Sequence, residues 1–237
     1  SNFRIADLKI KGYSKNSGSS HGIYMSGSWH IILDNIVMQD VRNGLHLIEV
    51  NWFEARDILI DGDLGGGIYN GVVGYSGSGY GTLGHFDRVY VIRPANDAFW
   101  FDCLNATMFN NVQALEPGGY GFFAGPNCGG GTSVLVNCQF DMSHNTSVYL
   151  NEAHDTHLIG CFVQGHTYDG DLTLGKSLHL LNCQRNTIVG GSIWGGKELI
   201  YLQNCQHTSI NGVFLLANRN SPPINYQYTA IIISGSN

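Results

Sequence analysis

Three carboxylates lie beside aromatic or apolar segments of this chain, and pairs of carboxylates are the groups that hydrolyse glycosidic bonds. One carboxylic acid protonates the leaving oxygen, while a second carboxylate activates water or attacks the sugar directly. Asp102 follows Phe99-Trp100-Phe101, and Glu49 and Glu152 follow similar segments. We expect Asp102 and Glu49 to be the acid/base pair, with Glu152 as a further candidate. The alternative for each is a carboxylate in solvent or one that caps a turn.

Aromatic and apolar residues near these carboxylates could contact a sugar or a second protein chain. The C–H faces of sugar rings pack on aromatic rings, and the candidates for such contact are Trp100, Tyr75, Tyr149 and His46. The candidates for packing between identical chains are Val73, Phe123, Tyr201 and Ile232. Val73, Phe123 and Ile232 carry no polar tip, which favours burial between subunits. Both uses stay open at this point.

Other chemistries have less support in the sequence. The chain has no CxxC or HExxH motif, and the segment Asp61-Gly-Asp63 lacks the closing Glu of an EF-hand. We therefore predict no metal and no cofactor. His154-Asp155 and His157 have no GxSxG motif to accompany them, which favours surface turns over a catalytic triad. A lyase would need a base beside a cation, and Arg56 and Arg88, one repeat apart, leave that possibility open.

The charge and hydropathy of the chain exclude two classes of partner. Its net charge is −6, and the Lys and Arg residues are scattered, so no basic stripe suits nucleic acid. No apolar run approaches the length of a membrane span. We predict no nucleic-acid binding and no membrane insertion.

Two pairs of cysteines are spaced one repeat apart: Cys138 with Cys161, and Cys183 with Cys205. We expect them to be small buried side chains in neighbouring coils. A disulfide between adjacent coils is the alternative that this spacing allows.

An internal repeat must position all of these residues. Its most regular part is a tripeptide in which two apolar residues flank a third, and successive copies begin 22 to 31 residues apart. The copies are Ile23-Tyr24-Met25, Leu45-His46-Leu47, Val72-Val73-Gly74, Phe99-Trp100-Phe101, Phe122-Phe123-Ala124, Val148-Tyr149-Leu150, Leu178-His179-Leu180, Ile200-Tyr201-Leu202 and Ile231-Ile232-Ile233. A fixed core with insertions of variable length is typical of solenoid coils.

A second apolar segment follows each tripeptide after a bend, as in Asn35-Ile36-Val37-Met38 and Asn137-Cys138-Gln139-Phe140. The bend position is Asn, Asp or Gly in nearly every coil, and these residues tolerate the left-handed backbone that a corner needs. Because the similar segments lie one repeat apart, we expect each strand to pair in parallel with its equivalent one coil away. A sandwich would need hairpins with short turns, and the Leu/Asn signature of leucine-rich repeats is absent from the sequence.

The predicted fold is therefore all-β: a single-stranded right-handed parallel β-helix, or solenoid, of about nine coils. Residues 1–237 form one β-helix domain, which we take to be a fragment of a longer chain. Alternation along each strand places the middle residue of every tripeptide on the outer wall. With coils about 4.8 Å apart, these residues form a stripe on the order of 40 Å long, and an apolar stripe of that size marks an interface or a ligand groove.

The coil pattern, with Ala6-Asp7-Leu8-Lys9-Ile10-Lys11-Gly12 and Gly22-Ile23-Tyr24-Met25, resembles the pectate-lyase-like β-helices. Within that group it is most similar to bacteriophage tailspike and depolymerase domains, and the resemblance spans essentially the whole chain. It implies a homotrimer in the phage virion that binds a bacterial surface polysaccharide and hydrolyses it, as a glycoside hydrolase rather than a lyase. The alternative is a non-enzymatic receptor-binding or structural module of a phage or bacterial surface protein. No family active-site motif can be carried over to residues of this chain.

Overall fold

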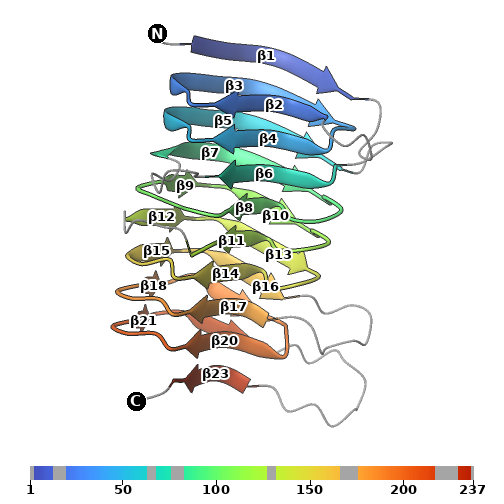
Figure 1. Ribbon diagram of the computed structural model, residues 1–237. Helices are drawn as coiled ribbons and strands as arrows, with labels where there is room; N and C mark the ends of the chain where they lie inside the picture. The colour runs from blue at the N-terminus through green and yellow to red at the C-terminus, as the bar shows by residue number, and fades with distance from the viewer. Residues whose placement is uncertain are drawn as a thin grey trace, which may run out of the picture.

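The computed structural model describes residues 3–12, 20–62, 68–75, 83–126, 132–165, 176–216 and 229–235. Every strand pairing among them is parallel and joins one coil to the next, as predicted. Down the stack, the chain runs leftward across the near side and returns rightward behind it, which is a right-handed coil (Figure 1). No helix that could cross a membrane occurs in this described part of the chain.

One face of the solenoid is a nine-stranded sheet that contains all the tripeptides. Its strands, in order, are β2 (His21–Ser26), β4 (Asn43–Ile48), β6 (Asn70–Tyr75), β8 (Phe99–Phe101), β11 (Phe122–Ala124), β14 (Val148–Asn151), β17 (Lys176–Leu181), β20 (Glu198–Gln203) and β23 (Thr229–Ser234). Complete turns are slightly fewer than the nine coils expected, because β23 is the only described strand of the last coil.

The remaining strands form a 14-stranded sheet that is folded into two walls. In the first coils one long strand covers both walls: β1 (Phe3–Lys11), β3 (Trp29–Gln39), β5 (Asn51–Asp61) and β7 (Leu83–Ile92). Below β7 the second wall is β9 (Met108–Asn110), β12 (Ser133–Val136), β15 (Thr156–Ile159), β18 (Thr187–Val189) and β21 (Ser209–Asn211). The third wall is β10 (Gln113–Leu115), β13 (Gln139–Ser143), β16 (Phe162–Gly165), β19 (Ser192–Trp194) and β22 (Phe214–Leu216). The sequence predicts only two strands in each coil. The structure shows a third strand position in each complete coil, that of the second wall.

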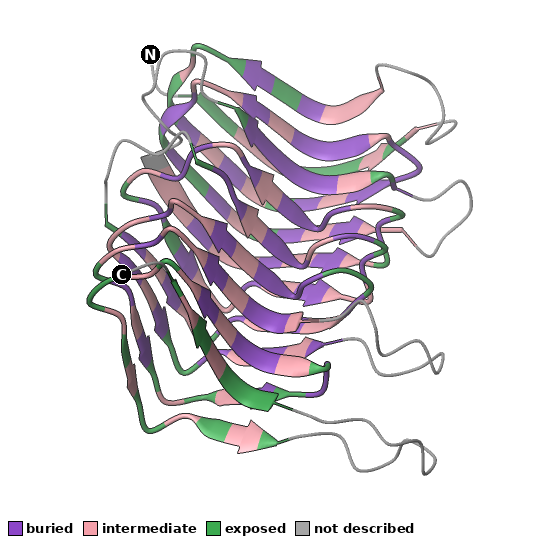
Figure 2. Ribbon diagram, turned by 60° about the horizontal axis from the view of Figure 1, so that its bottom comes forward, coloured by how far each residue is buried: buried purple, intermediate pink, exposed green. Residues whose placement is uncertain are grey.

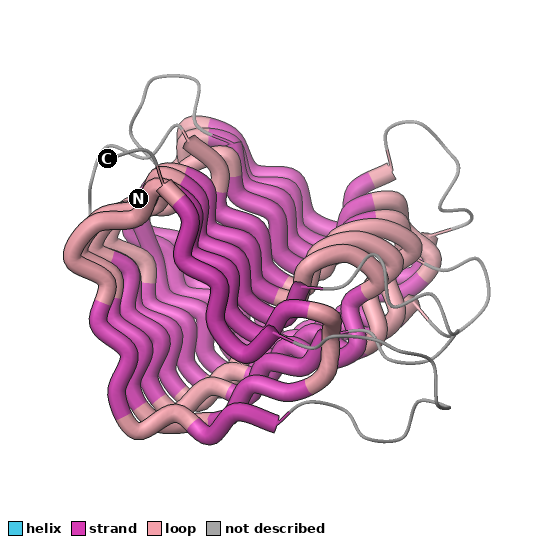
Figure 3. Tube along the Cα trace, turned by 90° about the horizontal axis from the view of Figure 1, so that it is seen from below, coloured by secondary structure: helices cyan, strands magenta, loops and turns pink. Residues whose placement is uncertain are grey.

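The bend predicted between strands is the corner between the second and third walls. The backbone there is left-handed in coil after coil, with φ of 52° at Asn35, 54° at Asp57, 51° at Asn137 and 65° at Gly160. Arg88 is the exception in residue type, with φ of 53°, and its Nε donates to Asp57 Oδ1 at 2.7 Å. Seen along the axis, these corners and the walls between them superpose from coil to coil (Figure 3).

The interior is filled by the inward residue of each strand, as the purple bands of Figure 2 show. Phe53, Phe86, Phe109 and Phe122 are essentially inaccessible to solvent, and the rings of Phe86 and Phe109 stack 4.9 Å apart. Aromatic pairs of this kind add to the burial of the rings themselves. This core fixes the register of the strands, because a slip of one residue would turn the phenylalanines outward.

Cysteines fill the corners much as expected. Cys138, Cys161 and Cys183 are buried, Cys205 is partly exposed, and none of them is bonded to another cysteine. Their thiols lie within hydrogen-bond distance of backbone carbonyls, such as Cys161 Sγ at 3.3 Å from Leu135 O.

Gly71 shows how tightly the coils approach one another at the edge of the nine-stranded sheet. A methyl group on Gly71 would lie 2.4 Å from the Ala98 carbonyl oxygen and 2.5 Å from Val91 Cγ1. We expect Gly71→Ala to lower the free energy of unfolding by about 1 to 3 kcal/mol, the usual cost of overpacking, measured by urea denaturation. Gly235→Ala is the control, since its methyl would meet only ordinary contacts at 3.5 Å or more. Equal stability of the two variants would contradict the close approach.

Candidate functional site

The middle residues of the tripeptides form one continuous column on the outer face of the nine-stranded sheet. Each is paired in register with the next: Tyr24, His46, Val73, Trp100, Phe123, Tyr149, His179, Tyr201 and Ile232. The flanking residues are buried in nearly every coil, while Tyr24 is 54% exposed. The predicted outward column is therefore confirmed as a structural feature.

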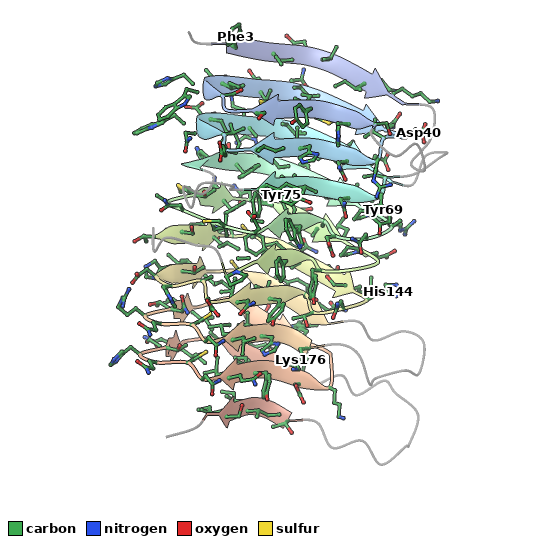
Figure 4. The ribbon with its side chains drawn as sticks, in the orientation of Figure 1. Phe3, Asp40, Tyr69, Tyr75, His144 and Lys176 are labelled. Atoms are coloured by element: carbon green, nitrogen blue, oxygen red, sulfur yellow. The ribbon has the colours of Figure 1, made fainter. Side chains whose placement is uncertain are left out.

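Val73 differs from its neighbours in the column, because its side chain is only 3% exposed. Tyr75, two residues later, lies 5.3 Å from the His46 ring and 4.9 Å from the Trp100 ring, between centroids. It thus spans the gap that the small Val73 leaves between His46 and Trp100. The prediction that Val73 offers an outward surface to a partner is wrong, because its side chain is almost completely buried; Tyr75, which is 39% exposed, offers that surface instead. Figure 4 labels Tyr75 beside β6.

The rings below Tyr75 stack on one another along the solenoid axis. Trp100 and Phe123 are 5.6 Å apart with planes 11° from parallel, and Tyr149 and His179 are 4.7 Å apart at 18°. Much of each ring face is therefore covered by the neighbouring ring. A ligand would meet mainly ring edges and polar tips in this part, and the open rings of Tyr24 and Tyr75 higher up.

The candidate carboxylates lie two coils apart, as the spacing of the repeat predicts. Asp102 is aligned with Tyr75, since Phe101 pairs with Gly74 and Asp102 N donates to Gly74 O at 3.0 Å. Glu49 and Glu152 each lie two coils away, at the following corner, with φ of 51° and 55°. Two coils correspond to about 10 Å, which exceeds the spacing of a retaining pair and is close to the upper end for an inverting one.

A polar column beside the rings was missed by sequence reasoning. It consists of the residue two positions before each tripeptide: His21, Asn43, Asn70, Asp97, Tyr120, Thr146, Lys176, Glu198 and Thr229. Its first three members form a ladder, with Asn70 Nδ2 donating to Asn43 Oδ1 at 2.9 Å and Asn43 Nδ2 lying 3.2 Å from His21 Nδ1. The constant spacing from the tripeptide is the signal that could have found them.

Asp97 is the most deeply buried acid of this polar column, at 8% exposure. Burial raises the pKa of its carboxyl, although Oδ1 accepts the Tyr120 backbone N–H at 2.8 Å. Burial also raises the pKa of Tyr75, and the charges of Asp102 and Asp97 raise it further. Asp97 thus precedes Trp100 along the chain and Asp102 follows it. The charges of both carboxylates act on the Tyr75 hydroxyl group.

A cationic group lies lower on the same face. Lys176 Nζ is 3.9 Å from the centroid of the Tyr201 ring and 3.7 Å from Glu198 Oε2, and Figure 4 labels Lys176 on β17. His179 stands between the Tyr149 and Tyr201 rings, 4.7 and 4.8 Å away. Burial, helped by the charge of Lys176, lowers the pKa of His179 to about 4.

This lowered pKa predicts a pH dependence of stability. Unfolding returns the pKa of His179 from about 4 to about 6.5, so the unfolded state binds more protons between those values. Stability is complete above pH 6.5 and falls as the pH decreases towards 4, by about 1 to 2 kcal/mol once the partial exposure of the ring is allowed for. We expect His179→Gln to flatten this slope in urea titrations at pH 4 to 7. An unchanged slope would contradict the assignment to His179.

Other candidates from the sequence have structural partners. His154 Nδ1 accepts the Gln184 backbone N–H at 3.1 Å, and Asp155 is paired with Arg185 at 2.6 Å, as the turn interpretation predicted. Arg56 faces Asp34 at 3.3 Å. Asp63 lies outside the described residues, and among those described no group of three or more His, Cys, Asp or Glu is placed to hold a metal ion.

Comparison with known proteins adds little to this geometry. No protein-family model matches the chain, and no curated protein matches it significantly. Among solved structures, the chain is similar to the A-module of a mannuronan C-5 epimerase of Azotobacter vinelandii. The identity is 14% and the TM-score 0.48, over 98% of this chain and 85% of that one. A similarity this distant says nothing about the activity of this chain. The evidence for the parallel β-helix is the strand pairing described above.

Proposed function

We propose that this β-helix binds a bacterial cell-surface polysaccharide along the outer face of its nine-stranded sheet and hydrolyses it. The observation that carries the proposal is the column of rings from Tyr24 to Tyr201, in which Tyr75 bridges the gap at Val73, with a polar column running beside it. A long polymer needs a long site with repeated apolar and hydrogen-bonding contacts, and the solenoid supplies one set of each per coil.

The proposed chemistry uses Asp102 and Glu49 as acid and base, with Glu152 as the alternative partner. The two-coil offset suits an inverting hydrolase, in which water stands between the sugar and the base. Trp100, Tyr75, Tyr149 and His46 then contact the sugar on either side of the bond that is cleaved. Within this proposal the reaction is a hydrolysis, because two cations beside this sheet are already engaged: Lys176 faces Glu198 and the Tyr201 ring, and Arg42 lies over the Tyr69 ring.

The proposal includes a phage tailspike setting, with three identical chains in the virion acting at the host surface. A second candidate keeps the fold but not the catalysis: a receptor-binding or structural module of a phage or bacterial surface protein. The mutual stacking of the rings favours it, since covered ring faces are poor sugar platforms. Phe123, Tyr201 and Ile232 would then pack between subunits. Light scattering that finds a monomer would argue against that packing.

Enzyme and binding module are separated by the release of new reducing ends. The purified chain is incubated with capsule and lipopolysaccharide preparations from a broad panel of bacteria. The proposal predicts new reducing ends from at least one preparation. Retained binding with no cleavage across the panel would instead establish the non-enzymatic candidate.

A further inference from the structure

We propose a second sugar-binding surface, the Trp52 site, on the second wall where β3 and β5 begin; it takes a neutral pyranose unit of a glycan. It comprises Trp29, His30, Trp52, Glu54 and Arg56. Trp52 is 62% exposed and Trp29 is 55% exposed, on a wall separate from the ring column. This inference does not rest on the proposed cleavage along the nine-stranded sheet.

The backbone at Trp52 is in the left-handed region, with φ of 56°, and that of His30 has φ of 55°. This conformation is unfavourable for a bulky side chain. An exposed ring recovers little of that strain through burial. Strain that the packing does not repay is found at functional positions, so the exposed indole points to a ligand.

The same corner recurs in later coils with other residue types. It is the position three residues before the buried residue of the second wall: Ala106, Asp155, Arg185 and His207 have φ between 45° and 55° there. These side chains are small or polar, and Asp155 and Arg185 form an ion pair with each other. The corner therefore does not require a tryptophan, and among the described residues with a left-handed backbone at this position only Trp52 carries an indole. The rings of His30 and Trp52 lie parallel within 21°, with centroids 6.2 Å apart.

Polar groups follow Trp52 along the outward side of β5. Glu54 and Arg56 occupy the next two outward positions, at a spacing of about 7 Å, with side chains 52% and 40% exposed. Arg56 Nη1 lies 3.9 Å from Glu54 Oε2, and Glu54 is paired in register with His85 on β7. An aromatic face next to a carboxylate and a guanidinium matches a pyranose: its C–H face packs on the indole, and its hydroxyl groups donate to Glu54 and accept from Arg56.

The charges favour a neutral sugar over a uronate. Arg4 and Arg56 both contact Asp34, and Arg56 also faces Glu54. An anionic sugar would have to displace one of these carboxylates, and it would be repelled by the exposed Glu54. A neutral sugar would not be repelled by Glu54 and would not have to displace a carboxylate.

Affinity gel electrophoresis tests the Trp52 site with defined probes. The native chain is run through gels that contain dextran, galactomannan, neutral lipopolysaccharide O-chains or, as the acidic comparison, alginate. We expect retardation by at least one neutral polymer, reduced at least tenfold in Trp52→Ala and Trp52→Asn and weakened in Glu54→Gln. Trp194→Ala, which removes a 37% exposed tryptophan from the third wall, should leave it unchanged.

Folding of the variants is checked by thermal melting. Asn tolerates the left-handed backbone better than Trp, so Trp52→Asn should melt at or above the native temperature while losing retardation. No retardation of the native chain by any neutral polymer, equal retardation of the Trp52 variants, or a melting point several degrees lower in Trp52→Asn would overturn the inference. Reducing-end release depends on Asp102 instead, so retardation that is lost in the Trp52 variants, with no cleavage across the bacterial panel, would support this site and contradict the proposed hydrolysis.

Discussion

Replacing Phe122 by alanine is expected to lower the free energy of unfolding by about 3 to 5 kcal/mol, the usual cost of removing a fully buried ring. Phe122 is inaccessible to solvent, and its ring centroid lies 5.1 Å from that of Phe109 and 5.5 Å from that of Phe140. The cavity would open where the nine-stranded sheet meets the other two walls. Urea denaturation, with the slope against denaturant checked for change, measures the difference.

The adjacent residue supplies a matched control of the same type. Phe123 lies on the outer face, partly exposed between Trp100 and Tyr149, so Phe123→Ala should cost about 1 to 2 kcal/mol. The contrast between two neighbouring phenylalanines tests the alternation on which the ring column depends. If Phe123→Ala were the more destabilising change, the register would be displaced by one residue and the column would lie in the core.

Replacing Asp102 by asparagine is expected to reduce reducing-end release at least 100-fold, because general acid–base catalysis contributes about 10² to 10⁴ in rate. The substitution keeps the size of the side chain and removes its charge and its ability to transfer a proton. Glu49→Gln should have a comparable effect if Glu49 is the partner, and Glu152→Gln if Glu152 is. The measurement is the initial rate on whichever polysaccharide the native chain cleaves.

Asp155→Asn is the control for that experiment, since Asp155 is a partly exposed acid at the start of the second wall, where it pairs with Arg185. Binding of the same polysaccharide should survive in Asp102→Asn and be weakened in Trp100→Ala. Undiminished cleavage by Asp102→Asn would remove Asp102 from the proposed mechanism and leave the sheet as a binding surface.

The fold was predictable because each coil repeats the same sequence pattern of an apolar tripeptide and a bend residue. Alternation in segments such as Leu45-His46-Leu47 sets which side chains face inward, and Asn or Gly at the bend, as at Asn137 and Gly160, sets the corner. The spacing between copies then leaves parallel pairing as the only register that superposes them. The second wall was missed because the corner before its short strands, such as β9 and β18, has no constant residue type, as Ala106 and Arg185 show.

The surface was less predictable, since it depends on how side chains lean between coils. Register alone placed Val73 outward, but Tyr75 extends between His46 and Trp100 and leaves Val73 buried. Nothing in the spacing shows that Trp100 and Phe123 stack face to face. Trp52 was missed because the second wall, on which it alternates outward with Glu54 and Arg56, was not recognised from the sequence.

The most direct test of the central claim is a crystal structure of the chain soaked with an oligosaccharide from a polysaccharide that it binds. We expect sugar density along the outer face of the nine-stranded sheet, over Tyr75 and the edge of Trp100, with one glycosidic oxygen within hydrogen-bond distance of Asp102. A face closed by contact with a second copy of the chain, or sugar bound only elsewhere, would contradict the proposed site.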